Sequence, residues 1–418
     1  MKIIVSHPTG NANVRAAIHA FAKHNMLAEF NTTISTHPNA KWLKLVPNSF
    51  RSELLRRSYP VDKQFISAHP FREIGRLGFQ KVGIKSLTKH EYGKFSVDAV
   101  YHNIDQSVAS KLKRLAGKTK PDAVYAYEDG ALQTFLQAEK MDVLRIYDLP
   151  KGYWRAERDL LRQEIEKRPD WAVTLAGFKD SKEKLDRKDQ ELSKAQHIIV
   201  ASSFTKSTLD YYDGKLASIS VIPYGFPPVI KEREYSYSSN RKLKLLFVGS
   251  LSQLKGLANV LEAVEELKDQ VELTIVGRKK TEECIPLNEG LAKHRYIPSL
   301  PHHEVLQEMG KHDIFLFPSL FEGFGLVVTE AMSQGTPVIA TLRTCAGDII
   351  NPDVNGWIVE AGSTSSLVNQ LKLILASPEK IEHVGRAAME SARARPWSQY
   401  GIELVAAVNE IFENRKLH

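Results

Sequence analysis

The segment PSLFEGFGLVVTE, residues 318–330, decides the fold class and locates the candidate site. It follows the apolar run DIFLFP, residues 313–318, which has the length and composition of a parallel strand buried on both faces. It leads into residues 327–334, whose pattern is amphipathic and indicates a helix. A strand, a glycine-containing loop and a helix in this order are typical of the ligand-binding edge of a parallel α/β sheet.

The loop has the chemistry of a nucleotide or sugar site. Gly323 and Gly325 let backbone N–H groups approach a phosphate, and the N-terminus of the following helix adds partial positive charge. Glu322 and Glu330 flank seven residues, and a carboxylate can accept hydrogen bonds from two neighbouring hydroxyls of a ribose or hexose. One glutamate capping a helix and another facing solvent would give the same pattern, so that alternative stays open.

The rest of the chain extends the alternation of strands and helices. In the second half, residues 243–249, 271–276 and 337–341 indicate strands, and residues 256–268 and 304–311 indicate helices. In the first half, the predicted strands are residues 2–6, 123–126, 144–148, 197–201 and 219–223. Residues 13–24 and the charged stretch 153–194 are predicted to be helical. This order predicts doubly wound parallel sheets.

A second motif, FVGSLSQLKG, covers residues 247–256 of the same half. Gly249 ends a predicted strand, and Lys255 lies where the next helix begins. A lysine at this place can neutralise a diphosphate as a point charge, although a solvated lysine is the plainer interpretation. A third segment, residues 201–225, contains Ser203 and Thr205 as candidate helix caps.

Composition and charge restrict the class of protein. The 418 residues fit two domains, no run of 18 apolar residues occurs, and the opening MKIIVSHP lacks the pattern of a signal peptide. Cys284 and Cys345 are the only cysteines, which favours a reducing, cytoplasmic setting. Residues 1–200 hold 34 Lys and Arg against 23 Asp and Glu, whereas residues 201–418 hold 23 against 26. The basic half therefore predicts contact with an anionic partner.

One basic stretch, residues 41–60, mixes apolar and positively charged side chains. This mixture suits the interface of an anionic membrane, but a helix packed on its own domain with a solvated basic edge would look the same. The candidate membrane-facing residues are Lys41, Trp42, Lys44, Arg51, Arg56 and Arg57.

Taken together, PSLFEGFGLVVTEAMSQGTPVIAT, FVGSLSQLKG and SSFTK with VIPYGF resemble family 4 retaining glycosyltransferases of the GT-B fold. The resemblance covers roughly residues 197–400 well. It implies an α/β protein of two Rossmann-like domains that face a central cleft. The acceptor-side domain would be residues 1–226, the linker 227–242, the donor-binding domain 243–395, and the helix crossing back to the first domain 396–418.

The resemblance also assigns roles to residues. It implies that Glu322 faces the donor sugar, that Lys255 grips the diphosphate and that Glu330 binds the ribose. The remaining donor-binding residues would be Phe324, Gly325, Leu326, Gly249, Ser250 and Arg278. Many members carry an arginine at the position of Ser250 or Leu254, and Arg278 is its candidate substitute here. Residues on the acceptor side would be Gly10, Asn11, Tyr147 and Asp148, the last two standing where many members have a His-Asp pair.

The function implied is transfer of a sugar from a nucleotide-diphosphate sugar to a glycan or lipid-linked acceptor, with retention of anomeric configuration. Such a hexosyltransferase of polysaccharide or glycoconjugate biosynthesis would be cytoplasmic, at the inner membrane face, and would need no metal or cofactor. A catalytically silent homologue that only binds sugar nucleotides or glycans is the alternative, followed by a sugar-nucleotide epimerase or a pyridoxal-dependent phosphorylase. A dinucleotide oxidoreductase and a nucleic-acid-binding protein are disfavoured, because the chain has no GxGxxG after its first strands and no basic motif interleaved with aromatic residues.

Overall fold

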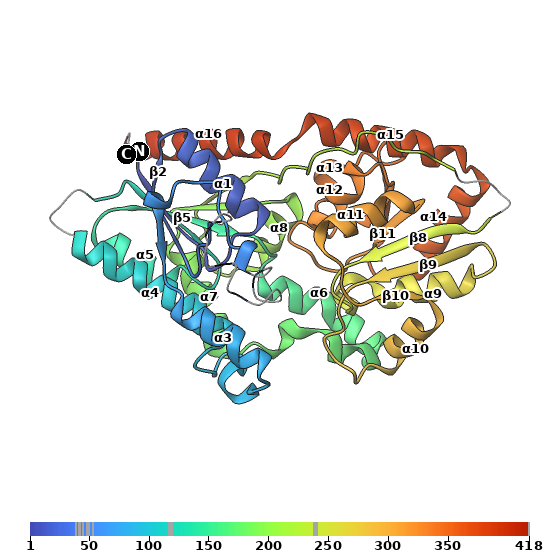
Figure 1. Ribbon diagram of the computed structural model, residues 1–418, viewed down its shortest axis with the longest axis horizontal. Helices are drawn as coiled ribbons and strands as arrows, with labels where there is room; N and C mark the ends of the chain where they lie inside the picture. Colours follow the sequence, from blue (N-terminus) through green and yellow to red (C-terminus); the bar gives the residue numbers. More distant parts are fainter. Residues whose placement is uncertain are drawn as a thin grey trace.

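The computed structural model describes residues 1–418 except 38–39, 41–42, 44–45, 47–50, 52–53, 116–119, 237–240 and 417–418. Figure 1 shows two α/β bodies side by side, with the last helices running along both of them. The paired strands form two sheets in which every described pairing is parallel. The predicted fold class, two Rossmann-like sheets with covering helices, is confirmed.

The first sheet has the strand order β3-β2-β1-β4-β5-β6-β7. Its strands are β1 Ile3–Ser6, β2 Leu27–Thr32, β3 Ile66–Ala68, β4 Ala123–Tyr127, β5 Leu144–Leu149, β6 His197–Val200 and β7 Ser218–Val221. Its α-helices are α1 Ala12–Lys23, α3 Phe71–Lys81, α4 Val97–Leu115, α5 Leu132–Lys140, α6 Trp154–Lys167, α7 Lys182–Lys194 and α8 Ser203–Thr208. Short 3-10 turns are η2 Lys63–Phe65, η3 Lys85–Thr88, η4 Pro169–Thr174, η5 Ala176–Lys179 and η6 Leu209–Tyr211.

The second sheet has the strand order β10-β9-β8-β11-β12-β13. Its strands are β8 Leu243–Val248, β9 Val271–Val276, β10 Arg295–Ile297, β11 Ile314–Phe317, β12 Val338–Thr341 and β13 Trp357–Val359. Its helices are η7 Gln253–Lys255, α9 Leu257–Glu266, α10 Ile285–Lys293, α11 His302–Lys311, α12 Leu326–Ser333, α13 Ala346–Ile349, α14 Thr364–Ala376 and α15 Glu379–Ala394. The central strand β11 is buried at every residue, as its continuous apolar run predicts.

The last helix, α16 Trp397–Lys416, returns to the first sheet and packs on α1. A side chain at Gly401 would meet the Cβ of Ala20 at 2.9 Å, so the two helices touch closely there. Tyr400 is fully buried in the same core as Phe21 and Tyr125 of the first domain. The crossover predicted from the sequence is therefore present.

The charged stretch 153–194 is not one continuous helix, contrary to the sequence-based expectation. It divides into α6, the turns η4 and η5, and α7. Pro169 lacks an N–H and disfavours a helical conformation in the residue before it, which explains why α6 ends at Lys167. Among the described residues, no helix combines the length and the apolar character that a bilayer span requires.

Candidate active site

The loop between β11 and α12 joins the two domains. Gly323 touches the first domain, since a Cβ there would lie 2.0 Å from the carbonyl oxygen of Pro150. The same residue's carbonyl oxygen accepts hydrogen bonds from Ser202 Oγ at 2.5 Å and Thr205 Oγ1 at 2.8 Å. The loop is also tied to its own domain, because Ser319 Oγ donates to the carbonyl of Leu254 at 2.9 Å. These contacts fix the residues that follow Pro318.

The turn into α12 depends on glycine. Gly325 has φ 89°, a left-handed conformation that other residues adopt at a cost, and it stands at the N-cap of α12. A Cβ at Gly325 would lie 2.6 Å from the ring of Phe317, so the position also lacks room. Phe324 is buried and packs on Tyr224 with ring centroids 4.8 Å apart, whereas Leu326 opens the helix half-buried. The first amides of α12 have no partner within the helix and are available to an anion.

Lys255 and Glu322 form an ion pair at the centre of the loop region. Their side chains are 16% and 22% exposed, so both are sheltered yet reachable from solvent. Gly256 makes the placement of Lys255 possible, because it has φ 71° and a Cβ there would lie 2.1 Å from the carbonyl oxygen of Pro318. The Lys255 Nζ lies 5.4 Å from the centre of the Phe317 ring.

Two further lysines surround Lys255. Burial, together with the positive charges of Lys151 and Lys280, lowers the pKa of Lys255 to about 7, while Glu157 acts in the opposite direction. Burial and the charge of Lys151 also lower the pKa of Lys280. Lys151 comes from the β5–α6 turn of the first domain and pairs with Glu157 at 2.6 Å. We call Lys151, Lys255 and Lys280 the lysine cluster. Three ammonium groups that disfavour one another's charge form an electrostatic site for an anion.

Glu330 lies on α12 and accepts a hydrogen bond from His302 Nε2 at 2.9 Å. That hydrogen bond raises the pKa of His302, against the opposing effect of partial burial. The Glu330 side chain is 17% exposed and His302 is 65% exposed, so the pair opens towards solvent. A carboxylate held in this way keeps acceptor capacity for the hydroxyls of a ligand.

Gly249, Ser250 and Arg278 occupy the ends of β8 and β9. A Cβ at Gly277 would lie 1.8 Å from the carbonyl oxygen of Gly249, so the two strand ends are in close contact. Ser250 Oγ is buried and has no hydrogen-bond partner among the described residues. Arg278 is exposed and donates to Ser299 Oγ at 3.3 Å. The positive charges that lower the pKa of Lys255, after burial, belong to Lys151 and Lys280 instead of to Arg278.

The acceptor-side candidates fall into two groups. Gly10 lies under the ring of Tyr59, which a Cβ at Gly10 would meet at 2.2 Å, and Asn11 is exposed at the start of α1. Tyr147 is instead fully buried, and its hydroxyl donates to Glu191 at 3.0 Å. Asp148 is 2% exposed and accepts from the hydroxyl of Tyr125 at 2.5 Å.

Asp148 sits among buried tyrosines that connect both domains. Burial raises its pKa to about 7, although the hydrogen bond from Tyr125 acts in the opposite direction. Tyr400 of α16 and Tyr224, which packs on Phe324, belong to the same core. The structure thus places Tyr147 and Asp148 in the interior, where they support the strand ends.

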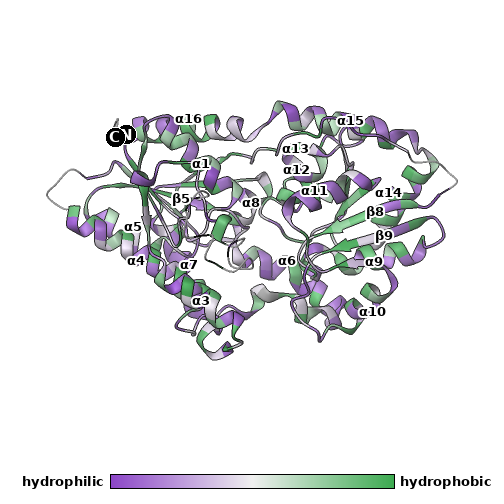
Figure 2. Ribbon diagram, viewed as in Figure 1, coloured by the Kyte–Doolittle hydropathy of each residue, from purple (hydrophilic) through white to green (hydrophobic). Residues whose placement is uncertain are grey.

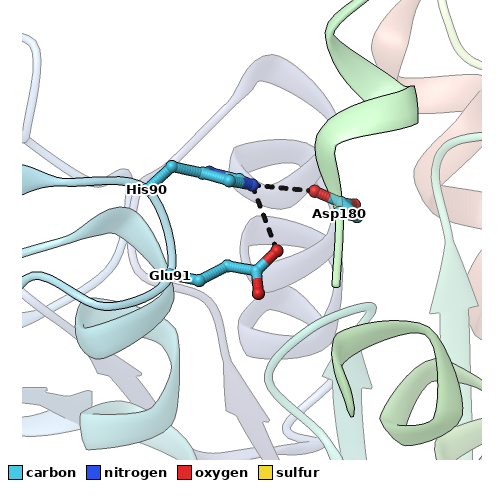
Figure 3. A group of neighbouring side chains, drawn as sticks. All are labelled: His90, Glu91 and Asp180. Atoms are coloured by element: carbon cyan, nitrogen blue, oxygen red, sulfur yellow. Dashed lines mark hydrogen bonds and ion pairs between the residues drawn. The ribbon is translucent and has the colours of Figure 1, made fainter. Parts of the chain in front are cut away.

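One group of potential metal ligands is found among the described residues, and it lies in the first domain. It consists of His90, Glu91 and Asp180 (Figure 3). His90 Nε2 lies 2.9 Å from Asp180 and 3.2 Å from Glu91, and Lys184 lies 3.3 Å from Asp180. Asp180 already faces Lys184, and Glu91 accepts a hydrogen bond from the backbone of Ser181, so we interpret the group as part of the packing of the first domain.

Sequence analysis did not identify Lys151, Lys280 or His302. Lys280 follows β9, which ends at the same edge of the second sheet as the loops at Lys255 and Glu322, and that position was a usable signal for it. Lys151 follows β5 of the first sheet, so its place in the sequence did not connect it with those loops. His302 opens α11, which packs against α12, and only this helix pairing connects it with Glu330.

Comparison with known proteins gives three findings. Residues 229–391 match the family described as glycosyl transferases group 1. Phosphatidyl-myo-inositol mannosyltransferase of Mycobacterium leprae is 31% identical over 160 residues, which are 37% of this chain and 43% of that relative. The match therefore spans less than half of the relative's length.

Two solved structures share the fold across nearly the whole chain. Sucrose-phosphate synthase from Thermosynechococcus elongatus superposes with a TM-score of 0.67 at 16% identity, covering 99% of this chain and 100% of that one. Anabaena HepE in complex with UDP gives 0.63 at 15% identity, covering 98% and 100%. At this identity the likeness concerns the arrangement of the two domains.

Proposed function

We propose that the protein transfers a sugar from a nucleotide-diphosphate sugar to an acceptor, retaining the anomeric configuration, and the match of residues 229–391 to the glycosyl transferases group 1 family supports this proposal. The observation that carries the proposal is the lysine cluster beside Glu322, with Glu330 on the helix that follows. It combines an anion site with two carboxylates of the kind that bind sugar hydroxyls.

Lys255, Lys151 and Lys280 bind the diphosphate of the donor. Burial, and after it the positive charges of the neighbouring lysines, lowers the pKa values of Lys255 and Lys280, and an anion lying among the three ammonium groups relieves their repulsion. As the bond to the sugar breaks, negative charge grows on the departing diphosphate, and ammonium groups already in place stabilise it. This stabilisation requires no metal ion, and we propose that the reaction proceeds without one.

Glu322 and Glu330 orient the two ends of the donor. Glu322, adjacent to Lys255, accepts hydrogen bonds from the transferred sugar, and Glu330, steadied by His302, accepts those of the ribose. The amides of Phe324, Gly325 and Leu326 hold the phosphate or the sugar at the helix N-terminus. HepE was solved with UDP and with UDP-glucose, so uridine nucleotides are the first donors to test.

The acceptor binds in the first domain, near Gly10. A cavity of about 620 Å³ lies beside it and is lined by Tyr59, Ser35, Thr36 and Lys63, among others. Its mixture of apolar and polar side chains suits a glycan or a lipid-linked acceptor. The name of the mycobacterial relative includes a phosphatidylinositol, which supports the lipid-linked class. Cys284 and Cys345 are buried free thiols and fit a reducing compartment, so we place the activity in the cytoplasm.

A thermal-shift screen tests this proposal. The purified protein is heated with UDP, GDP, ADP and their sugar conjugates, and the screen is repeated on Glu330→Ala. We expect one nucleotide to raise the Tm of the wild type and to have little effect on the variant. If none of them raises the Tm at millimolar concentration, the sugar-nucleotide site is refuted.

The metal-free mechanism has its own test. Once a donor and an acceptor give turnover, the assay is repeated in excess EDTA. The rate should be unchanged. Complete loss of turnover that manganese restores would contradict stabilisation by the lysine cluster alone.

A further inference from the structure

An apolar surface is concentrated in residues 71–97 of the first domain, from α3 to the start of α4. Of the fourteen exposed large hydrophobic side chains in the described part of the chain, six belong to this segment, which we call the α3 patch. Figure 2 shows α3 with both hydrophobic and hydrophilic colouring at the outer edge of the first body. The six are Phe71, Ile74, Val82, Ile84, Tyr92 and Val97, with exposed fractions from 42% to 75%. Scattered exposed hydrophobics are normal, but clustering on this scale marks an interaction surface.

The charges around the α3 patch have one sign. Lysines at 81, 85, 89 and 94 are exposed, whereas the two acidic residues of the segment, Glu73 and Glu91, and the adjacent Asp98 are not. Glu73 is buried and paired with Arg57 and Arg76. Glu91 accepts a hydrogen bond from the backbone of Ser181, and Asp98 is buried beside Lys184. The patch therefore presents apolar side chains within a positively charged rim.

The surface is held in place by packing and ion pairs. Phe95 stacks against Phe79 with ring centroids 5.0 Å apart and fills the space above Gly75. The cluster of His90, Glu91 and Asp180 fastens the segment to the turn that precedes α7 (Figure 3). The exposed apolar groups are thus presented by a fixed framework.

We propose that the α3 patch binds the interface of an anionic membrane. Apolar side chains at such an interface enter the boundary between headgroups and acyl chains, and lysines extend their ammonium groups to the anionic headgroups. A second copy of the chain is a poor occupant, because a two-fold contact would bring two lysine rims together. The proposal does not depend on the glycosyltransferase activity.

This surface differs from the one expected from the sequence. Of that set, Lys41, Trp42 and Lys44 lie outside the described residues. Arg51 and Arg56 are described, whereas Arg57 is buried and its guanidinium pairs with Glu73 of α3 at 2.7 Å. The ion pair between Arg57 and Glu73 therefore helps to hold α3 against the rest of the first domain.

Vesicle co-sedimentation of the full chain tests the proposal. Vesicles of phosphatidylcholine alone are compared with vesicles containing 30% phosphatidylglycerol, at about 0.1 M salt, where charges on a surface still act over about 10 Å. The variants are Lys85→Ala with Lys89→Ala, and Ile74→Ser with Ile84→Ser. Matched controls at exposed positions elsewhere are Lys215→Ala with Lys231→Ala, and Leu373→Ser with Ile402→Ser.

We expect binding to the anionic vesicles only, weakened about 30-fold by loss of the two lysines and at least tenfold by loss of the two isoleucines. The controls should bind like the wild type. A Tm equal to that of the wild type in every variant would show that the variants are folded. The proposal would be overturned if the wild type did not bind the anionic vesicles, or if the control variants lost as much vesicle binding as the patch variants. It would also be overturned if the patch variants bound vesicles normally and lost only self-association, measured by light scattering.

Discussion

Replacing Gly323 by alanine should disrupt the loop that joins the two domains. The new Cβ would lie 2.0 Å from the carbonyl oxygen of Pro150, whereas an ordinary C···O contact is about 3.3 Å, so loop and turn must separate by about 1.3 Å. The carbonyl of Gly323 would then lose good geometry to Ser202 and Thr205, which now donate at 2.5 and 2.8 Å. Overpacking of this kind costs about 1–3 kcal/mol and each of the two lost hydrogen bonds about 1 kcal/mol, so we expect about 3–5 kcal/mol in all.

Differential scanning calorimetry and a turnover assay measure the two consequences. With an unfolding entropy of about 2.1 cal/mol/K per residue for the whole chain, 3 kcal/mol corresponds to a Tm lower by about 3 °C. Because Glu322 precedes the displaced residue, turnover should fall by about 100-fold. Gly347→Ala is the matched control, since a Cβ there would meet its nearest neighbour at 3.5 Å in ordinary contact. If the Gly323→Ala variant kept the wild-type Tm and turnover, the contact of Gly323 with Pro150 would not be what positions the loop.

Three further predictions concern single side chains. Lys255 has a pKa of about 7 in the free protein, and an anion binds its charged form. The affinity for UDP should therefore fall as the pH rises above 7, by up to about tenfold per pH unit, and calorimetric titration of Lys255→Ala should show a weaker pH dependence. Burial raises the pKa of Asp148 from 3.8 to about 7, so between these pH values the folded state holds a proton that the unfolded state has released. The stability of the wild type should therefore fall as the pH rises from 4 to 7, and the Tm of Asp148→Asn should fall less over the same range. His302→Ala removes the hydrogen bond to Glu330 and should weaken UDP binding about 3- to 10-fold, and unchanged affinity would remove His302 from the site.

Much of the fold could be predicted from the sequence because buried parallel strands leave a clear pattern. The apolar runs at residues 243–249 and 313–318 became β8 and β11, and the glycines of the loop after β11 marked the turn into α12. Some strands were not predicted from the sequence. β2 contains the polar residues Glu29 and Asn31, and β3, β10 and β13 are only three residues long. Their pairing depends on neighbours distant in the sequence, which periodicity does not reveal.

In the candidate site, the sequence pointed to residues that lie within its two glycine-containing motifs. Lys255 and Glu322 were both identified, and their ion pair depends on the contact between the two loops. Lys151 could not be associated with them, because it comes from the other domain and reaches the site through the contact of Gly323 with Pro150. Tyr147 and Asp148 were assigned to the acceptor side from the resemblance, because they stand where many members of the family have a His-Asp pair. In the structure, alternation along β5 directs one towards Glu191 and the other towards Tyr125, both in the interior.

Isothermal titration with UDP, on the wild type and three lysine variants, tests the central claim most directly. The variants are Lys255→Ala, Lys280→Ala and, as matched control, Lys279→Ala, whose ammonium group is engaged by Glu282 and Asn288. If the lysine cluster binds the diphosphate, Lys255→Ala and Lys280→Ala should each weaken UDP binding by about 10-fold or more, and Lys279→Ala should leave it unchanged. Equal affinity in all four proteins, or no heat of binding in the wild type, would contradict the account.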